Sequence, residues 1–432
     1  MLRTTDAATI PLGLMDVHER PIHVSKSTFK GGVVKPVHRW FRLTPSFGPD
    51  LVRTMLRHLD HGAGERVLDP FAGRGTTLIE CQILGIEAVG VEINPFLSWV
   101  TESSLYWDIR TAAIDDALGW LEDNFRQRKE VTNIDSVLND ASRLPPIHNA
   151  TRWWRPDVLR DLVVLKESIA GLPADPHVRR ILSLALAGVL VPQLTNVTLG
   201  RLQFAFITRD NDEIDVLGTF VRQVRMLQAD LSDVQRRGLT QTASVITGDC
   251  TSPDGLDGIG QVDLVITSPP YPNRYSYVWN TRPYLYLFEF FTTPIEAAAL
   301  DKKTIGGTWG TATSVLAKGE VEPLNDVVAR VVGPRVADIR RHDDLMANYA
   351  MKYFNDLARH LMSLKPHLTE HARLAYVVGW SRLRGVTVET DELLGGLIEG
   401  LDLQMRVESL TRFRQRHSDV GLHESVVYAR RR

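Results

Sequence analysis

The sequence predicts an α/β protein with a doubly wound, mostly parallel sheet that is interrupted by a helical insert. Between about residues 45 and 100, helical and extended patterns alternate. Residues 101–240 then carry mostly helical patterns, and strands return at residues 244–246 and 262–266. The last of these is a continuous apolar run, which is typical of a parallel strand buried on both faces. Strands that alternate with helices are the pattern of a doubly wound sheet.

Each element has its own local signal. The first part of the sheet is predicted from helices at residues 50–59 and 76–84 and strands at 66–68 and 88–91. In the insert, apolar residues recur at helical spacing over residues 158–169, 178–191 and 214–231. Later, residues 349–364 form an amphipathic helix and residues 372–378 an apolar strand. Extended stretches at 404–411 and 424–428 predict a C-terminal antiparallel hairpin.

This pattern divides the chain into six segments. Residues 1–37 are predicted to be an irregular N-terminal arm, because Gly31, Gly32 and Pro36 break regular structure. The main domain is expected to comprise residues 38–100, 241–291 and 349–432. Two segments interrupt it: the helical insert at 101–240 and a weakly periodic segment at 292–348.

Composition excludes several classes of protein. The 432 residues are 44% hydrophobic and 24% charged, as in an ordinary globular protein. Cys81 and Cys250 are far apart and lack metal-ligand spacing, which argues against a zinc site or a disulfide framework and fits a reducing cytoplasm. The N-terminus lacks the apolar run of a signal peptide. Residues 181–191 are about half as long as a membrane span requires, so we expect a buried helix there.

Charge is unevenly distributed, although the formal net charge is only −2. Residues 20–49 contain no Asp or Glu but six Lys or Arg. A second basic group lies near the C-terminus: Arg412, Arg414, Arg416, Arg430, Arg431 and Arg432. Local patches of this kind neutralise phosphates in proteins that bind nucleic acids. They are equally consistent with solvated termini.

The first chemical signal is the glycine-rich turn Val67-Leu-Asp-Pro-Phe-Ala-Gly73-Arg-Gly75-Thr-Thr77, which follows a predicted strand and opens a helix. Glycines let a ligand approach the backbone, and a helix N-terminus offers free N–H groups. A P-loop is excluded, because no Lys follows Gly75. A dinucleotide fingerprint is also excluded, because Leu78 occupies the place of the third glycine.

Acidic residues beside the turn narrow the choice of ligand. Asp69 closes the strand before the turn, where a carboxylate could hold the ammonium of an amino-acid group. Glu92 ends the next predicted strand about twenty residues later, a position suited to ribose hydroxyls. A ligand with both an amino-acid end and a ribose is S-adenosylmethionine, and we expect this cofactor.

Residues 69–77, Asp-Pro-Phe-Ala-Gly-Arg-Gly-Thr-Thr, resemble the cofactor motif of the amino-methylating DNA methyltransferase family. The resemblance implies a Rossmann-like methyltransferase fold, with Glu92 on the ribose and Asp249 on the adenine ring. Residues 40–50 are similar to the family's N-terminal cofactor segment, whose Phe lines the methionine pocket; core packing is the alternative for that Phe. The implied cofactor-binding residues are Phe47, Asp69, Pro70, Phe71, Gly73, Gly75, Thr76, Thr77, Glu92 and Asp249.

The second signal is a buried strand that runs into Ser268-Pro269-Pro270-Tyr271. Active sites of open α/β sheets lie at the carboxyl ends of strands, where both motifs fall. An exocyclic amine of a base is a poor nucleophile, and acceptors aimed at its N–H groups favour the pyramidal form. Ser268 Oγ and the Pro269 carbonyl are the candidate acceptors. Prolines stiffen the loop, and Tyr271 offers a flat face to a base swung out of the duplex.

The residue types also indicate which amine is methylated. Neither cysteine stands in the Pro-Cys context that a C5-cytosine methyltransferase needs. Within the family that the chain resembles, Ser at the first loop position is typical of N4-cytosine enzymes, and Asp or Asn of N6-adenine enzymes. We therefore expect N4-cytosine methylation, with N6-adenine methylation as the first alternative. An RNA methyltransferase or a catalytically idle DNA-binding protein of this fold is the second. Direct transfer from a sulfonium needs no metal.

Double-stranded DNA is the expected partner, and Asn273 and Arg274 are the expected DNA-side residues. The resemblance, which also covers residues 377–381, extends over about half of the chain and implies a possible cognate restriction endonuclease. The cofactor motif precedes the catalytic motif, in contrast to many N4-cytosine enzymes, so the target-recognition segment is not given by motif order. It is either the helical insert or, preferred slightly, residues 292–348, which contain Lys302, Lys303, Arg340, Arg341 and His342.

Overall fold

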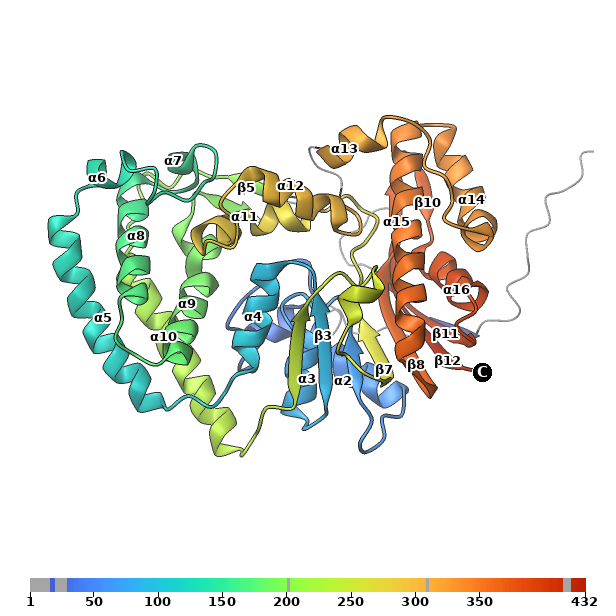
Figure 1. The fold of residues 1–432 in the computed structure, drawn as a ribbon, viewed down its shortest axis with the longest axis horizontal. Coiled ribbons are helices and arrows are strands. Elements are labelled where there is room, and N and C mark those ends of the chain that lie inside the picture. The colour runs from blue at the N-terminus through green and yellow to red at the C-terminus, as the bar shows by residue number, and fades with distance from the viewer. Residues whose placement is uncertain (1–15, 20–28, 200–202, 308–310, 415–420) are drawn as a thin grey trace, which may run out of the picture.

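The computed structural model describes residues 16–19, 29–199, 203–307, 311–414 and 421–432. Within these residues, an eight-stranded sheet has the order β1-β11-β12-β8-β7-β2-β3-β6 (Figure 1). The strands are β1 Asp16–Glu19, β2 Val67–Asp69, β3 Ala88–Glu92, β6 Ala243–Thr247, β7 Val262–Thr267, β8 Leu368–Gly379, β11 Met405–Arg414 and β12 His423–Arg431.

The sheet is mostly parallel, as the sequence predicts. Strands β6, β3, β2, β7 and β8 are adjacent in this order and run parallel to one another. The C-terminal antiparallel hairpin is confirmed: β12 pairs antiparallel with β11 and also with β8. One prediction is wrong, because the N-terminal arm is not irregular throughout. Its strand β1 pairs parallel with β11 and extends the sheet at that edge.

Helices cover both faces of the sheet, so the fold is doubly wound. Alternate residues of a strand point to opposite faces. In β7, Leu264 and Ile266 join the hydrophobic cluster of one face and Val265 that of the other. The first cluster includes helices α2 (Pro49–His58), α3 (Thr76–Ile83) and α4 (Pro95–Leu105). The second includes α14 (Asp326–Arg340), α15 (Asp344–Leu364) and α16 (Thr390–Gly400).

The helical insert lies on the left of Figure 1. Its helices are α5 (Thr111–Val131), α6 (Ile134–Leu138), α7 (Ala150–Trp153), α8 (Pro156–Ala170), α9 (Pro176–Val189) and α10 (Val216–Arg236). A π-helical turn, Leu190–Leu194, continues α9 through Pro192. The sequence did not predict the small antiparallel hairpin of β4 (Val197–Leu199) and β5 (Phe204–Phe206).

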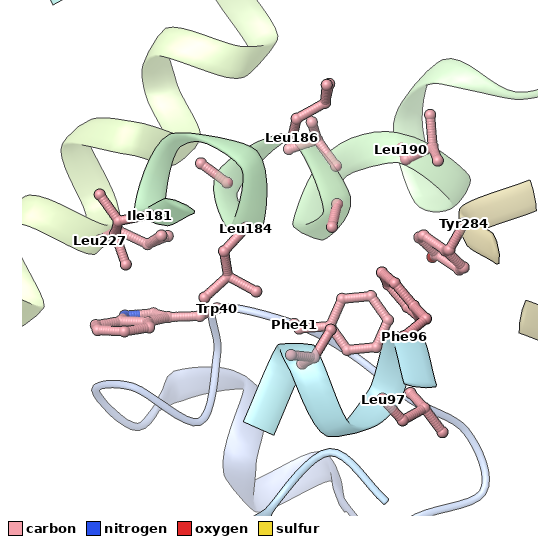
Figure 2. Close-up of a cluster of buried hydrophobic side chains, with 14 of the residues drawn as sticks. Trp40, Phe41, Phe96, Leu97, Ile181, Leu184, Leu186, Leu190, Leu227 and Tyr284 are labelled. Carbon is pink, nitrogen blue, oxygen red and sulfur yellow. The ribbon is translucent and has the colours of Figure 1, made fainter. Parts of the chain in front are cut away.

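The insert shares its hydrophobic core with the main domain. In Figure 2, Trp40 and Phe41 of the chain before α2 lie against side chains of α9, with Phe96 of α4 and Tyr284 beside them. The Phe41 and Phe96 ring centroids are 5.5 Å apart, and those of Phe96 and Tyr284 are 4.8 Å apart. Helix α4 also crosses the predicted boundary at residue 100. The insert is therefore packed into the main domain rather than attached beside it.

Residues 292–348 are more helical than their weak periodicity indicates. Helix α12 (Pro294–Lys303) lies above the sheet in Figure 1, beside α11 (Tyr277–Leu287), which precedes this segment, and α13 (Thr311–Leu316) follows. Thr293 and Glu296 form a capping box that starts α12. Helix α14 belongs to the layer that covers the sheet, because its buried side chains join the second cluster.

A two-stranded hairpin, β9 (Ser381–Leu383) with β10 (Val386–Val388), follows β8. No helix in the described ranges is long and apolar enough to cross a membrane.

Candidate functional site

A cavity of about 580 Å³ opens at the carboxyl ends of strands β2, β3, β6 and β7. Strand order brings these ends together, because the four strands are parallel neighbours of one sheet. The lining includes residues of both predicted motifs: Phe47, Pro70, Phe71, Gly73, Thr76, Glu92, Asp249, Ser268, Pro269, Pro270 and Tyr271. The cofactor turn and the proline-rich loop therefore face one space.

The glycine-rich turn is shaped by contact with α4. Gly73 and Gly75 have φ values of 54° and 83°, a region that favours glycine. A Cβ on Gly75 would lie 2.6 Å from Thr101 Cγ2, so no larger residue fits. The Thr101 hydroxyl also donates to the Gly73 carbonyl at 2.9 Å. Gly75 is thus required for packing, and it is not a lining residue of the cavity.

Two carboxylates enter the cavity from neighbouring strands. Glu92 accepts hydrogen bonds from the backbone N–H groups of Gly73 at 2.7 Å and Asn94 at 2.8 Å. Burial raises the pKa of Glu92 to about 7, although these bonds oppose the shift. Asp249 follows β6 and accepts from the backbone N–H and the hydroxyl of Thr251. Both acids keep the acceptor capacity that hydroxyl or amine donors of a ligand require.

Asp69 lies behind the turn and does not line the cavity. Its side chain is buried, with 1% of the residue exposed. It accepts from Thr267 Oγ1 at 2.6 Å and from the Phe71 backbone N–H at 3.1 Å. Burial raises the pKa of Asp69 to about 6. Because Thr267 directly precedes Ser268, Asp69 connects the cofactor turn with the start of the proline-rich loop. Thr77 is likewise buried and donates to the Ile266 carbonyl at 3.4 Å.

A buried arginine, which the sequence analysis missed, holds the segment that carries Phe47. Arg74 is 2% exposed and donates to the His38 carbonyl at 2.7 Å. Burial lowers the pKa of Arg74 to about 9. The His38 ring in turn contacts the Glu80 carboxylate at 3.0 Å. The signal that could have revealed this role is a charged residue between the two glycines of a buried turn.

The proline-rich loop is fixed by two tyrosines. The Tyr353 hydroxyl of α15 donates to the Pro270 carbonyl at 2.8 Å. The Tyr271 hydroxyl donates to Glu424 Oε1 of β12 at 3.3 Å. A Cβ on Gly379 would lie 2.7 Å from Tyr271 Cδ2, so the ring lies directly against this glycine. Glu424 lines the cavity and was not predicted; its place at the start of a predicted strand carried no chemical signal.

The two residues that we expected to face DNA do not line the cavity. Asn273 Oδ1 accepts from the Tyr275 backbone N–H at 3.0 Å, so this amide stabilises the loop. Arg274 has a φ of 62°, and its backbone N–H donates to the Tyr349 hydroxyl at 3.1 Å. Two other cations, Arg42 and Lys303, are exposed and line the cavity itself.

Of the two cysteines, Cys250 lines the cavity and Cys81 does not. Cys81 and Cys250 are both buried, and burial raises the pKa of both thiols. In the part of the chain that the structure describes, no group of His, Cys, Asp and Glu side chains is arranged to hold a metal ion.

Comparison with known proteins agrees with this geometry. A family model described as DNA methylase, for N6 and N4 methylation, matches residues 28–100. The type II methyltransferase M.AvaI of a Nostoc species is 41% identical over 68 residues. The type II methyltransferase M.MvaI of Kocuria varians is 21% identical over 349 residues, which cover 78% of this chain and 74% of that protein. Within residues 28–100, the chain is therefore similar to amino-methylating DNA methyltransferases.

The similarity at high identity is local. The match to M.AvaI covers 16% of this chain and 14% of that protein, so it spans a small part of the relative's length. A tRNA (guanine(10)-N2)-dimethyltransferase of Methanothermobacter thermautotrophicus is 38% identical over 71 residues, 16% of this chain and 20% of that protein. The M.MvaI alignment extends much further along the chain, although at lower identity.

Proposed function

We propose that this protein transfers a methyl group from S-adenosylmethionine to an exocyclic amine of a base in double-stranded DNA, at N4 of cytosine. One observation carries the proposal: a single cavity is lined by the cofactor turn, by Glu92 and Asp249, and by the Ser268–Tyr271 loop. A volume of about 580 Å³ lies within the range of sites for drug-sized ligands.

The residues present fit S-adenosylmethionine. Glu92 and Asp249 end adjacent strands and are suited to hold the ribose hydroxyls and the adenine amine. Phe47, Phe71 and Ile93 supply apolar walls, and Gly73 leaves the backbone open to close approach. When bound, the cofactor supplies a methyl group already activated on a sulfonium. Asp69 supports this site from behind, by fixing the turn, instead of contacting the ligand.

The loop residues act on the amine. Ser268 Oγ and the Pro269 carbonyl accept its N–H hydrogens, which favours the pyramidal nitrogen whose lone pair attacks. The adjacent Pro270 carbonyl is occupied by Tyr353, so it holds the loop in place. Tyr271 has its ring against Gly379 and lines the cavity, where a swung-out base could stack on it.

The choice of cytosine N4 depends on Ser268, and N6-adenine methylation is the alternative. Family resemblance supports both, because the matching family model covers N6 and N4 methylation. The local similarity to a tRNA dimethyltransferase makes an RNA amine the second alternative. The longer alignment to a type II methyltransferase favours DNA and a restriction–modification setting. A cognate endonuclease is part of the proposal from family resemblance alone.

Cations at the cavity support contact with DNA phosphates. Arg42 and Lys303 are exposed on its lining, and Lys302 is exposed beside them. Arg340 and Arg341 are less suited to DNA, because Arg340 pairs with Glu320 and Asp344, and Arg341 with Asp338. We therefore place the recognition segment in the part of residues 292–348 that precedes α14. Arg274 remains a proposed DNA contact, whereas Asn273 serves the loop.

Labelled nucleosides test the proposal. The protein is incubated with isotope-labelled S-adenosylmethionine and either mixed duplex DNA or RNA, and the digested nucleosides are identified by mass spectrometry. Label on N4-methylcytosine is expected. Label on N6-methyladenine, or on RNA alone, would replace the cytosine assignment, and no label on any substrate would reject the activity.

Variants separate the two halves of the site. Ser268→Ala and Tyr271→Ala should lower turnover by about 100-fold or more while cofactor affinity stays near normal, because they lie on the amine side. Asp69→Ala should weaken cofactor binding, measured by calorimetry, because the turn loses its support. Full turnover by Tyr271→Ala would contradict a role for this ring at the base.

A further inference from the structure

Glu424 is a half-buried residue whose carboxyl group lines the cavity, and the proposed function gives it no role. It lies on β12, directly opposite Gly379 of β8 in the strand register. The Tyr271 hydroxyl donates to Glu424 Oε1 at 3.3 Å. Ser268 lies three residues before Tyr271 on the same cavity lining, and its hydroxyl opposes the rise in the pKa of Tyr271 that burial causes. Ser268, Tyr271 and Glu424 all belong to the cavity lining, and this line of three oxygen-bearing side chains leads from the proline-rich loop to β12.

Three parts of the fold hold this line in place. Gly379 lets the Tyr271 ring lie close to β8, since a Cβ there would come within 2.7 Å of Tyr271 Cδ2. Two prolines stiffen the chain between Ser268 and Tyr271, and Tyr353 binds the Pro270 carbonyl. Strand β12 is paired on both sides, with β8 and β11, which fixes Glu424.

Methylation of an amine must end with loss of a proton. The nitrogen forms the new N–C bond with its lone pair, and the electron pair of the broken S–C bond stays on sulfur. The methylated nitrogen is then cationic until one N–H proton leaves. A serine hydroxyl accepts a hydrogen bond from this N–H but is too weak a base to keep the proton. A carboxylate can keep it.

We propose that Glu424 is the terminal acceptor of the proton released by the methylated amine, which reaches it through Ser268 and Tyr271. This inference rests on the proposed function. The amine proton passes to Ser268 Oγ, the Ser268 proton to Tyr271 Oη, and the Tyr271 proton to the Glu424 carboxylate. Each oxygen thus receives one proton as it gives one up. Glu424 later returns its proton to solvent.

The surroundings of Glu424 suit this role. Burial raises the pKa of Glu424 to about 7, and the Tyr271 hydrogen bond opposes the shift. His423 and Ser425 point to the opposite face, because side chains alternate along a strand. There the His423 ring meets Trp380, and Ser425 donates to Asp391, which also pairs with Arg412. Among the described residues, the ionisable groups on the side of Glu424 are Tyr271 and Tyr277, and Glu92, Asp249, Cys250, Arg42 and Lys303 lie elsewhere on the cavity lining.

Single-turnover kinetics across pH 5.5–9 test the relay. The wild-type rate should rise with pH through the pKa of Glu424. Glu424→Gln and Tyr271→Phe should each lower the methyl-transfer rate at pH 8 by about 100-fold and remove its increase with pH. The rate of the double variant should be no lower than that of either single variant. Both variants keep the ring and the acceptor geometry, so cofactor affinity should be unchanged. Glu408→Gln, on β11 and paired with Arg430, is the matched control and should behave as wild type.

A second readout needs no reaction. Infrared spectra of the cofactor-free protein, recorded across pH, should contain a carboxyl band that is absent in Glu424→Gln and therefore belongs to Glu424. In Tyr271→Phe, the pKa read from this band should be higher, because the ionised carboxylate loses a hydrogen-bond donor. An unchanged pH profile in Glu424→Gln, or an unshifted titration in Tyr271→Phe, would overturn the relay while leaving the proposed function intact. A wild-type protein that methylates no nucleic acid would overturn both.

Discussion

Three carboxyl groups at the candidate site have a raised pKa: Asp69 and Glu92 are buried residues, and Glu424 is half-buried. Burial, the largest cause in each case, raises the pKa of Asp69 to about 6 and the pKa values of Glu92 and Glu424 to about 7. Their ordinary values are 3.8 for Asp and 4.5 for Glu. The folded chain therefore holds these protons more tightly than the unfolded chain. Their contribution to stability is full below about pH 4 and is lost as pH rises through 6 to 7.

Glu92 makes cofactor binding dependent on pH. The ionised carboxylate attracts a cationic ligand and accepts ribose hydroxyls, whereas the protonated acid does so poorly. Affinity for S-adenosylmethionine should therefore rise as pH increases through about 7. In Glu92→Gln, calorimetry at pH 6, 7 and 8 should show affinity lower by about tenfold at pH 8 and a weaker dependence on pH. If the affinity of Glu92→Gln for the cofactor changed with pH as steeply as that of the wild-type protein, this role for Glu92 would be contradicted.

At the scale of elements, the cofactor turn depends on how closely α3 approaches α4. Gly75→Ala adds a Cβ that would lie 2.6 Å from Thr101 Cγ2, at a φ of 83°. Gly85 has a similar φ of 71°, and nothing lies within 4 Å of its added Cβ. Gly85→Ala should cost about 1 kcal/mol of unfolding free energy from backbone strain alone. Gly75→Ala should cost about 1–3 kcal/mol more, because the contact is overpacked. Urea denaturation measures the unfolding free energy of both variants. Equal decreases in the two variants would show that Thr101 moves aside.

Elements with a strong local pattern could be predicted from the sequence. The buried strand β7 and the helices α8 and α10 lie within a few residues of their predicted ranges. Strand β1 could not be predicted, because its partner β11 is almost four hundred residues away in the chain. Helix α14 was missed for another reason: it carries Gly333 and an internal Pro334, and its apolar stripe is weak. Tertiary packing on α15 stabilises it instead.

The candidate site was predictable to the extent that its residues lie in local motifs. Both motif loops face the cavity as expected. Asp69 and Thr77 lie behind it, since a residue that ends a strand can point to either side and the motif does not say which. Glu424 could not be found, because only the strand order brings β12 beside the proline-rich loop. Groups joined by long-range pairing leave no local pattern.

At the scale of the whole molecule, one buried carboxylate connects the insert to the cofactor site. Asp230 of α10 is 2% exposed and accepts from the Val37 backbone N–H, from Trp40 Nε1 and from Arg39. These donors belong to the segment that leads to Phe47. The main domain and the insert should therefore unfold together.

Removal of this carboxylate should destabilise both parts. Asp230→Ala leaves buried donors without an acceptor and should lower the unfolding free energy by about 3–5 kcal/mol. Fluorescence and circular dichroism should report one shared transition in urea, and cofactor affinity should fall as well. Asp233→Ala, three residues along the same helix and paired at the surface with Arg236, is the control and should change little. Two separate transitions in the wild-type protein would contradict the shared core.

The close fit between Gly188 and Trp40 limits how this molecule can change in evolution or by engineering. A Cβ on Gly188 would lie 2.3 Å from the Trp40 carbonyl oxygen, so α9 and the segment before α2 meet almost backbone to backbone. Exchange of the insert between relatives would carry one side of this fit without the other. The parts of this fold that must be exchanged together are therefore not continuous in the sequence. Residues 35–48 and 101–240 pack against each other as one such part, although α2, β2, α3, β3 and the start of α4 lie between them in the chain.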